Sequence, residues 1–288
     1  MDYLLHLFIM FAIFAILGVS LNLLVGYTGL LSVTHAAFYG VGAYATAIIT
    51  TKFGVNFFLS VILGALLSGG IALLIGMVLS KFSDDYYALA SLGFGVIVYS
   101  VMLNWDSLTR GTLGIPGIPK PAIFGVSFEA PVMFLALAGI LLLFAYWISS
   151  CIVGSSFGRV LKAIREDEEA LQVFGYHGVH YKLAIFVMSA GMAAIAGSLY
   201  ASYISFIDPT SFMLTESIFI IALIIVGGLG NLKGSLLGAL IMILLPEALR
   251  FVGFPDGVAA QMRQFVYGVL LILLMLYRPR GVVGEYTL

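Results

Sequence analysis

The chain has 288 residues, of which 62% are apolar and only 9% are charged, and its formal net charge is -1. A soluble domain of this length could not bury so much apolar surface, and the charge balance gives no sign of nucleic-acid binding. The single cysteine, Cys151, excludes an intrachain disulfide framework. The composition therefore predicts an all-α polytopic membrane protein, with residues 1–288 forming one transmembrane domain.

Nine apolar segments are candidate membrane spans, because about 20 helical residues cross a hydrocarbon core of roughly 30 Å. They cover residues 4–25, 30–49, 57–79, 86–104, 132–150, 183–205, 217–226, 235–249 and 265–277. The seventh and eighth are short and flank a glycine-rich stretch at 227–234. They are either full spans that run into this stretch or broken half-helices inside a bundle. We expect eight to ten spans, with nine as the best count.

Basic residues set the expected orientation, because cytoplasmic loops are enriched in Lys and Arg. Arg159, Lys162, Arg165 and Lys182 lie in or beside one charged stretch, and Arg278 and Arg280 follow the last span. Both regions are therefore predicted to be cytoplasmic. Nine crossings then place the N-terminus and residues 106–127 outside, although Arg110, Lys120, Arg250 and Arg263 on that side count against it. The first segment has no basic residue before it and is expected to remain as a span.

The charged stretch, residues 155–178, is the predicted cytoplasmic coupling loop. Apolar residues recur in it at helical spacing: Phe157, Leu161, Ile164, Leu171 and Phe174. This pattern predicts one amphipathic helix over residues 156–174, which docks on a partner instead of crossing the membrane. The pairs Lys162–Glu166 and Arg165–Glu169 would each add a few tenths of a kcal/mol. Gly175 is expected to end the helix in a left-handed conformation.

Polar residues are rare inside the spans. Glu129, Glu216 and Glu247 are expected near span ends, and the absence of central acids disfavours an ion-coupled carrier. Asn22 shares a helix face with small residues and serves either helix packing or a substrate path. For His35 a packed histidine is favoured over a path role. Small residues at 193, 197 and 201 predict a seam where two helices approach closely.

The sequence contains no P-loop and no dinucleotide-binding glycine motif, so any ATP must be used by a partner. It also lacks an acid pair, a Cys/His cluster or a Ser-His-Asp arrangement, and His177 and His180 have no third ligand type beyond nearby acids. We therefore expect no enzymatic activity, no metal and no cofactor on this chain, with ATP-Mg held by partner subunits. A charged docking helix without a nucleotide site needs an external motor.

Several motifs, in order along the chain, resemble the LivM-like permeases of branched-chain amino-acid ABC importers. The run from Gly158 to Glu168, followed by Glu169-Ala170 and Gly175, is similar to the family's cytoplasmic coupling loop. Further matches lie at residues 26–32, 35–38, 42–44, 114–119, 226–230 and 278–281. The resemblance implies that the ATPase is contacted by Arg159, Arg165, Glu166, Asp167, Glu168, Glu169 and Gly175.

The resemblance also implies partners: a homologous second permease, two ATPase subunits, and a periplasmic or lipid-anchored substrate-binding protein, assembled at the bacterial inner membrane. Arg110 in the outer loop is expected to meet the binding protein, or else to be a solvated loop charge. The substrate is expected to pass a face lined by Asn22, His35 and Gly42. One alternative is the same importer type for urea, short amides or other amino acids. Another is an ATP-independent channel or facilitator.

Overall fold

The computed structural model describes residues 2–82, 84–123, 126–250, 265–266, 268–269, 272–273, 276–278 and 280–286. Its long helices are α1 (Asp2–Leu21), α2 (His35–Phe53), α3 (Phe57–Leu79), α4 (Asp84–Asn104), α6 (Pro131–Gly154), α9 (Gly178–Ile204), α10 (Leu214–Gly227) and α11 (Leu232–Arg250). A π-helix, η1 (Asn22–Gly26), continues α1. The coupling loop forms α7 (Ser156–Glu166) and α8 (Glu168–Val173).

Shorter elements connect these helices. They are α5 (Asp106–Thr109), the 3-10 helices η2 (Gly111–Leu113) and η3 (Pro209–Phe212), and the strands β1 (Ile115–Pro116), β2 (Ala122–Ile123), β3 (Val126–Ser127) and β4 (Phe206–Ile207). Because each of these strands has only two residues, the prediction of an all-α membrane protein is confirmed.

Five helices among the described residues are long and apolar enough to cross a bilayer. They cover Asp2–Gly26, Phe57–Leu79, Asp85–Asn104, Pro131–Gly154 and Gly178–Ile204. The count of nine spans therefore stays a prediction. The ninth predicted segment, residues 265–277, lies largely outside the described residues.

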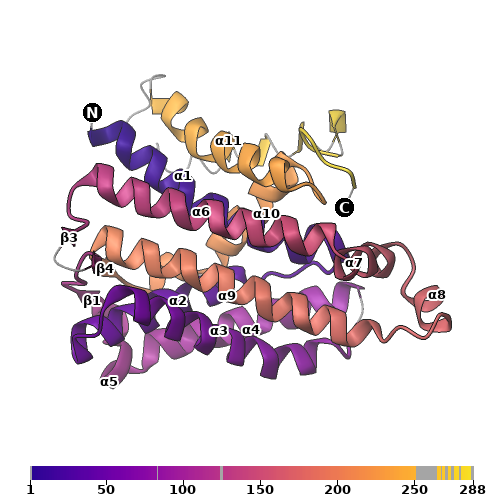
Figure 1. Cartoon of the computed structure of the whole chain (residues 1–288), viewed down its shortest axis with the longest axis horizontal. Coiled ribbons are helices and arrows are strands. Elements are labelled where there is room, and N and C mark those ends of the chain that lie inside the picture. The colour runs from indigo at the N-terminus through magenta and orange to yellow at the C-terminus, as the bar shows by residue number, and fades with distance from the viewer. Residues whose placement is uncertain are drawn as a thin grey trace.

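The helices form a central group surrounded by others that face outward. Helices α1, α2 and α9 pack together in the middle, with α3, α4, α6 and α11 around them (Figure 1). In the most apolar part of α1, 78% of residues are buried, against 22% in α4. Side chains such as Leu74, Ile97 and Leu143 remain exposed on the outer helices. Apolar exposure of this extent is what a lipid-facing surface requires.

Small residues let α2 and α9 pack closely. A Cβ on Gly42 would lie 2.2 Å from the Ala194 carbonyl oxygen, and one on Gly197 would lie 2.0 Å from the Tyr39 carbonyl oxygen. Ala193 and Ala201 are fully buried on the same side of α9. The predicted seam of small residues is confirmed, and Gly42 belongs to it because only a residue without a side chain allows this approach.

The bundle has two distinct ends. The N-terminus, α5, β1, β3 and β4 lie at one end, and α7 and α8 lie at the other (Figure 1). Strand β1 pairs antiparallel with β4, with Ile115 opposite Ile207, which ties the loop after α4 to the end of α9. The start of α1 and residues 106–123 and 126–127 therefore share an end opposite the coupling loop, as the sequence predicted for their relative placement.

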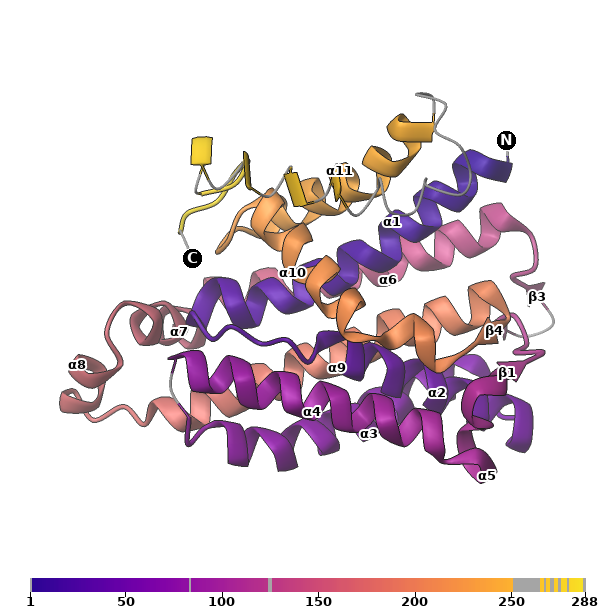
Figure 2. The ribbon, with the colours of Figure 1, turned by 180° about the vertical axis from the view of Figure 1, so that it is seen from behind.

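Two helices begin inside the bundle. The sequence predicted an uninterrupted span for the first, and for the second it left a full span and a broken half-helix open. Residues 29–34 are not helical and α2 starts only at His35, which is 1% exposed. Helix α10 starts at Leu214, directly after the 3-10 helix η3 and Met213, and Figure 2 shows residues 29–34 and η3 reaching into the bundle. The first turns of α2 and α10 contact each other, because the Ala36 amide donates to the Ser217 hydroxyl at 3.1 Å.

This arrangement corrects one prediction and favours one of two open alternatives. Glu216, expected near a span end, lies in the first turn of α10 and therefore within the bundle. For the eighth segment, where a full span and a half-helix were both open, helix α11 runs for 19 residues with Pro246 inside it, which favours the full span. Helix α10 has 14 residues, or about 21 Å at 1.5 Å per residue, and is the shorter of the two.

Candidate coupling site and buried polar cluster

The coupling loop folds as two helices and not as the single helix that was predicted. The break lies at Asp167, whose backbone is extended and whose carboxylate accepts a hydrogen bond from the Ala170 amide at 2.9 Å. An aspartate in this position caps the following helix, so the charge run contains its own helix start. Ser155 caps α7 in the same way, accepting from the Gly158 amide. Gly175 has a φ of +85° just after α8, as predicted.

The prediction of an apolar face on this loop is correct in part. Leu161, Ile164 and Leu171 are buried against the bundle. Phe174, predicted on the same stripe, is 79% exposed, and Val173 beside it is 86% exposed. The break at Asp167 explains the difference, because residues of α8 do not continue the helical face of α7. Two large apolar side chains therefore point away from the protein at this end.

Arg165 points into the protein and not toward a partner, which corrects its predicted exposure. Its Nη1 atom donates to the carbonyl oxygens of Val25 at 2.9 Å and Gly26 at 2.5 Å, at the end of η1. The guanidinium lies over the Tyr286 ring, 4.3 Å from its centroid. Burial lowers the pKa of Arg165 from its ordinary value, while Tyr286 and Glu166 oppose this shift. Arg165 thus joins the coupling loop to the first helix.

The other charges of the loop divide into inward and outward groups. Lys162 pairs with Glu285 at 3.3 Å in place of the predicted Glu166. Glu168 is half-buried and pairs with Lys182 on α9, so it holds the loop together. The predicted coupling residues that remain exposed are Arg159, Glu166, Asp167, Glu169 and Gly175.

Asn22 is fully buried, and its amide joins η1 to the glycine-rich turn between α10 and α11. Its Nδ2 donates to the carbonyl oxygens of Gly228 at 3.3 Å and Asn231 at 2.9 Å, and to the Ser235 hydroxyl at 2.7 Å. Its Oδ1 accepts from the Gly230 amide at 3.0 Å. A residue so fully bonded inside the protein holds elements together, as buried polar groups generally do.

His35 is the centre of a second buried contact. Its Nε2 lies 3.1 Å from the Ser20 hydroxyl and 3.2 Å from the Ser189 hydroxyl, which links α1, α2 and α9. Asn22, His35 and Gly42 are thus all interior packing residues in this conformation. In this conformation they do not line an open face, because the small residues around them bring the helices together, and their part in a substrate path stays a prediction.

Residues 281–286 complete the coupling site, although the sequence did not mark them as part of it. The amides of Val282 and Val283 donate to the carbonyl oxygens of Val226 and Gly227, both at 3.0 Å, so residues 281–286 run along the glycine-rich turn. Tyr286 then meets Arg165. We call Arg165, Tyr286, η1 and residues 226–231 the coupling node. For the C-terminal part of this node, the only sequence signal was the motif at 278–281.

Arg110 lies at the opposite end of the bundle. It is exposed and adopts a left-handed backbone, with a φ of +64°, where it ends α5. The Lys52 ammonium donates to the carbonyl oxygens of Ser107 and Leu108 and fixes this loop to the end of α2. The loop is therefore anchored to the helices, and the Arg110 side chain faces outward from it.

Apolar helices around a tightly packed centre, with a charged loop beyond one end, define a multi-pass membrane protein. A family model described as "Branched-chain amino acid transport system / permease component" matches residues 3–275. The chain therefore belongs to this family of permeases.

Relatives from bacteria and archaea support this assignment. The chain is 32% identical to the high-affinity branched-chain amino acid transport system permease protein LivM of Salmonella typhimurium, over 93% of this chain and 67% of that protein. It is 24% identical to a probable LivM permease of Methanocaldococcus jannaschii, covering 96% and 91%. It is also 25% identical to the LivH permease of Escherichia coli, covering 94% and 91%. No solved structure matches the chain.

Proposed function

We propose that this chain is one of two membrane-spanning subunits of an ATP-driven importer for branched-chain amino acids in the bacterial inner membrane. Its likeness to both LivM and LivH relatives supports a pair of related permeases. Two separate ATPase subunits hold and hydrolyse ATP-Mg. A substrate-binding protein, periplasmic or lipid-anchored, selects the amino acid and delivers it.

The distribution of basic residues supports a cytoplasmic position for the α7/α8 end. Eight of the 13 Lys and Arg residues belong to segments at this end: Lys81, Arg159, Lys162, Arg165, Lys182, Lys233, Arg278 and Arg280. By the positive-inside rule, the opposite end, with the N-terminus and the Arg110 loop, then lies outside, which agrees with the nine predicted crossings. Arg110 is available there to an acidic surface of the binding protein.

The outward surface of α7 and α8 is the observation that carries the ATPase assignment. It combines exposed charges, Arg159, Glu166 and Glu169, with the exposed apolar pair Val173 and Phe174. These residues lie beyond the ends of the spans, so lipid does not cover them (Figure 1). An amphipathic surface of this kind suits a groove on a partner protein. Movement of the loop would reach α1 through the coupling node.

Copurification of the permease pair with its ATPase tests this assignment. We expect Phe174→Asp to weaken ATPase binding by about 30-fold, because a buried aromatic anchor contributes about 2 kcal/mol or more to an interface. The matched control is Leu113→Asp, which changes a side chain of similar exposure, 81%, at the opposite end. Equal ATPase binding by the two variants would remove α8 from the ATPase interface.

A further inference from the structure

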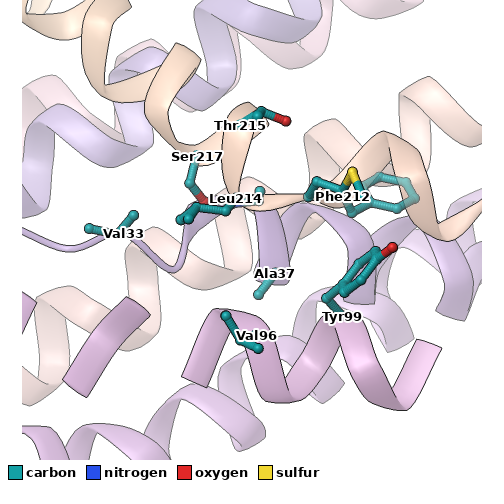
Figure 3. Close-up of a pocket in the computed structure, with 11 residues that line it drawn as sticks. Val33, Ala37, Val96, Tyr99, Phe212, Leu214, Thr215 and Ser217 are labelled. Carbon is teal, nitrogen blue, oxygen red and sulfur yellow. Dashed lines mark hydrogen bonds between the residues drawn. The ribbon is translucent and has the colours of Figure 1, made fainter. Parts of the chain in front are cut away.

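A cavity of about 350 Å³ lies inside the bundle, where α2 and α10 begin. Its wall includes Val33 and Ala37 on one side, Phe212 and Leu214 on another, and Val96 and Tyr99 from α4 (Figure 3). The volume falls within the range of about 300–1,000 Å³ that small-molecule sites occupy. The cavity is half enclosed, so a ligand can enter and leave it.

The cavity exists because its wall contains residues with little or no side chain. Ala36, Ala37 and Gly95 all line it. A Cβ on Gly95 would meet only the Val33 carbonyl oxygen, at the ordinary contact distance of 3.6 Å. A larger side chain at position 95 would therefore extend into space that is open in this structure.

The chemistry of the wall selects for an aliphatic group. The residues described in the wall are apolar except for the hydroxyls of Tyr99, Thr215 and Ser217, and none of them is charged. The Ser217 hydroxyl already accepts from the Ala36 amide. Such a wall can desolvate a branched aliphatic side chain but cannot bind the charged ends of an amino acid strongly. Weak binding is what passage requires.

The position of the cavity links it to both ends of the protein. Residues 28–34 run from η1, which Arg165 contacts, to Val33 in the wall, and the Val33 amide donates to the Ser91 hydroxyl of α4 at 3.0 Å. From the end of the bundle that holds α5, the chain runs through β4 and η3 to Phe212, in the cavity wall opposite Val33. Movement of the coupling loop can therefore be transmitted to the cavity through η1 and residues 28–34.

We propose that this cavity seats the aliphatic side chain of the amino acid during its passage across the membrane. The inference rests on the proposed function and adds a specific place for the substrate within this chain. It predicts that the size of the cavity influences how fast amino acids of different size are transported, even when the binding protein delivers each of them equally.

The test uses the complete importer in proteoliposomes, with the binding protein saturated by leucine or by valine so that its own selectivity is removed. Gly95→Leu is expected to lower the leucine-to-valine ratio of maximal uptake rates by about tenfold, the effect of one methylene in a tight apolar pocket. Gly93→Leu is the matched control on α4, because a Cβ there meets nothing within 4 Å. Val96→Ala enlarges the cavity and should shift the ratio toward leucine.

The outcomes separate the two proposals. If the unaltered importer moves leucine and valine but neither Gly95→Leu nor Val96→Ala changes their ratio, or if the control Gly93→Leu lowers it as much as Gly95→Leu does, the cavity proposal is wrong and the proposed function stands. If Gly95→Leu fails to assemble, Val96→Ala alone decides, since this half-exposed residue can be shortened with little loss of packing. An unaltered importer that moves neither amino acid overturns the proposed function itself.

Discussion

Replacing Arg165 by alanine should uncouple ATP hydrolysis from transport without removing the ATPase. The side chain makes two hydrogen bonds to carbonyl oxygens of η1 and lies over Tyr286, so it holds α7 against the first helix. We expect the ATPase to bind normally, because its proposed contact surface is unchanged. Transport should fall because the loop can then move without moving η1.

The free energy with which Arg165 attaches the coupling loop to η1 can be worked out from these contacts. A hydrogen bond from a charged group contributes about 1.5 kcal/mol or more, and a cation–π contact about 0.5–1 kcal/mol at an exposed site. The full sum is about 4 kcal/mol. Since the guanidinium is only half-buried, solvent replaces part of this, and we take about 2 kcal/mol for the attachment. This corresponds to an increase of about 30-fold in the population of detached loops.

Uptake and ATP hydrolysis should be measured together in proteoliposomes. Arg165→Ala is expected to raise the number of ATP molecules hydrolysed per amino acid at least tenfold, and Arg165→Lys should recover part of the coupling because it keeps the charge but loses the fork geometry. Arg159→Ala, on the exposed face of the same helix, should instead weaken ATPase binding. If Arg165→Ala gave unchanged coupling, the coupling node would have no role in transmission. If it lost the ATPase like Arg159→Ala, Arg165 would be a direct contact.

Three further predictions follow from the packing and the topology. Gly42→Leu should prevent stable folding, measured as loss of a thermal transition in detergent, because its side chain would collide with the α9 backbone, whereas Gly70→Leu in open space should fold normally. Asn22→Leu should lower the free energy of unfolding by about 2–4 kcal/mol through unsatisfied buried partners, and unchanged stability would contradict the structural role. Cysteines at Leu113 and Phe174 should react with an impermeant reagent from outside and inside the cell, respectively, and labelling of both from one side would refute the topology.

The long helices were predictable because each apolar segment carries its own evidence. Residues 57–79, for example, were predicted from hydropathy alone and form α3 with the same bounds. The coupling loop was also visible, since charges are rare elsewhere. Its break at Asp167 was missed because acidic residues suit both a helix surface and a helix cap, and only the backbone conformation distinguishes the two.

By itself the sequence determined the class of fold, the location of the charged loop and the resemblance to a permease family, because composition and local motifs are properties of neighbouring residues. Only the tertiary structure decided that Arg165 faces inward, that Asn22 bonds to a turn about 200 residues away, and that α2 and α10 begin together beside a cavity. These features depend on which helix faces meet. In a bundle of apolar helices, that choice is made by close contacts between small residues and by a few buried hydrogen bonds between distant segments.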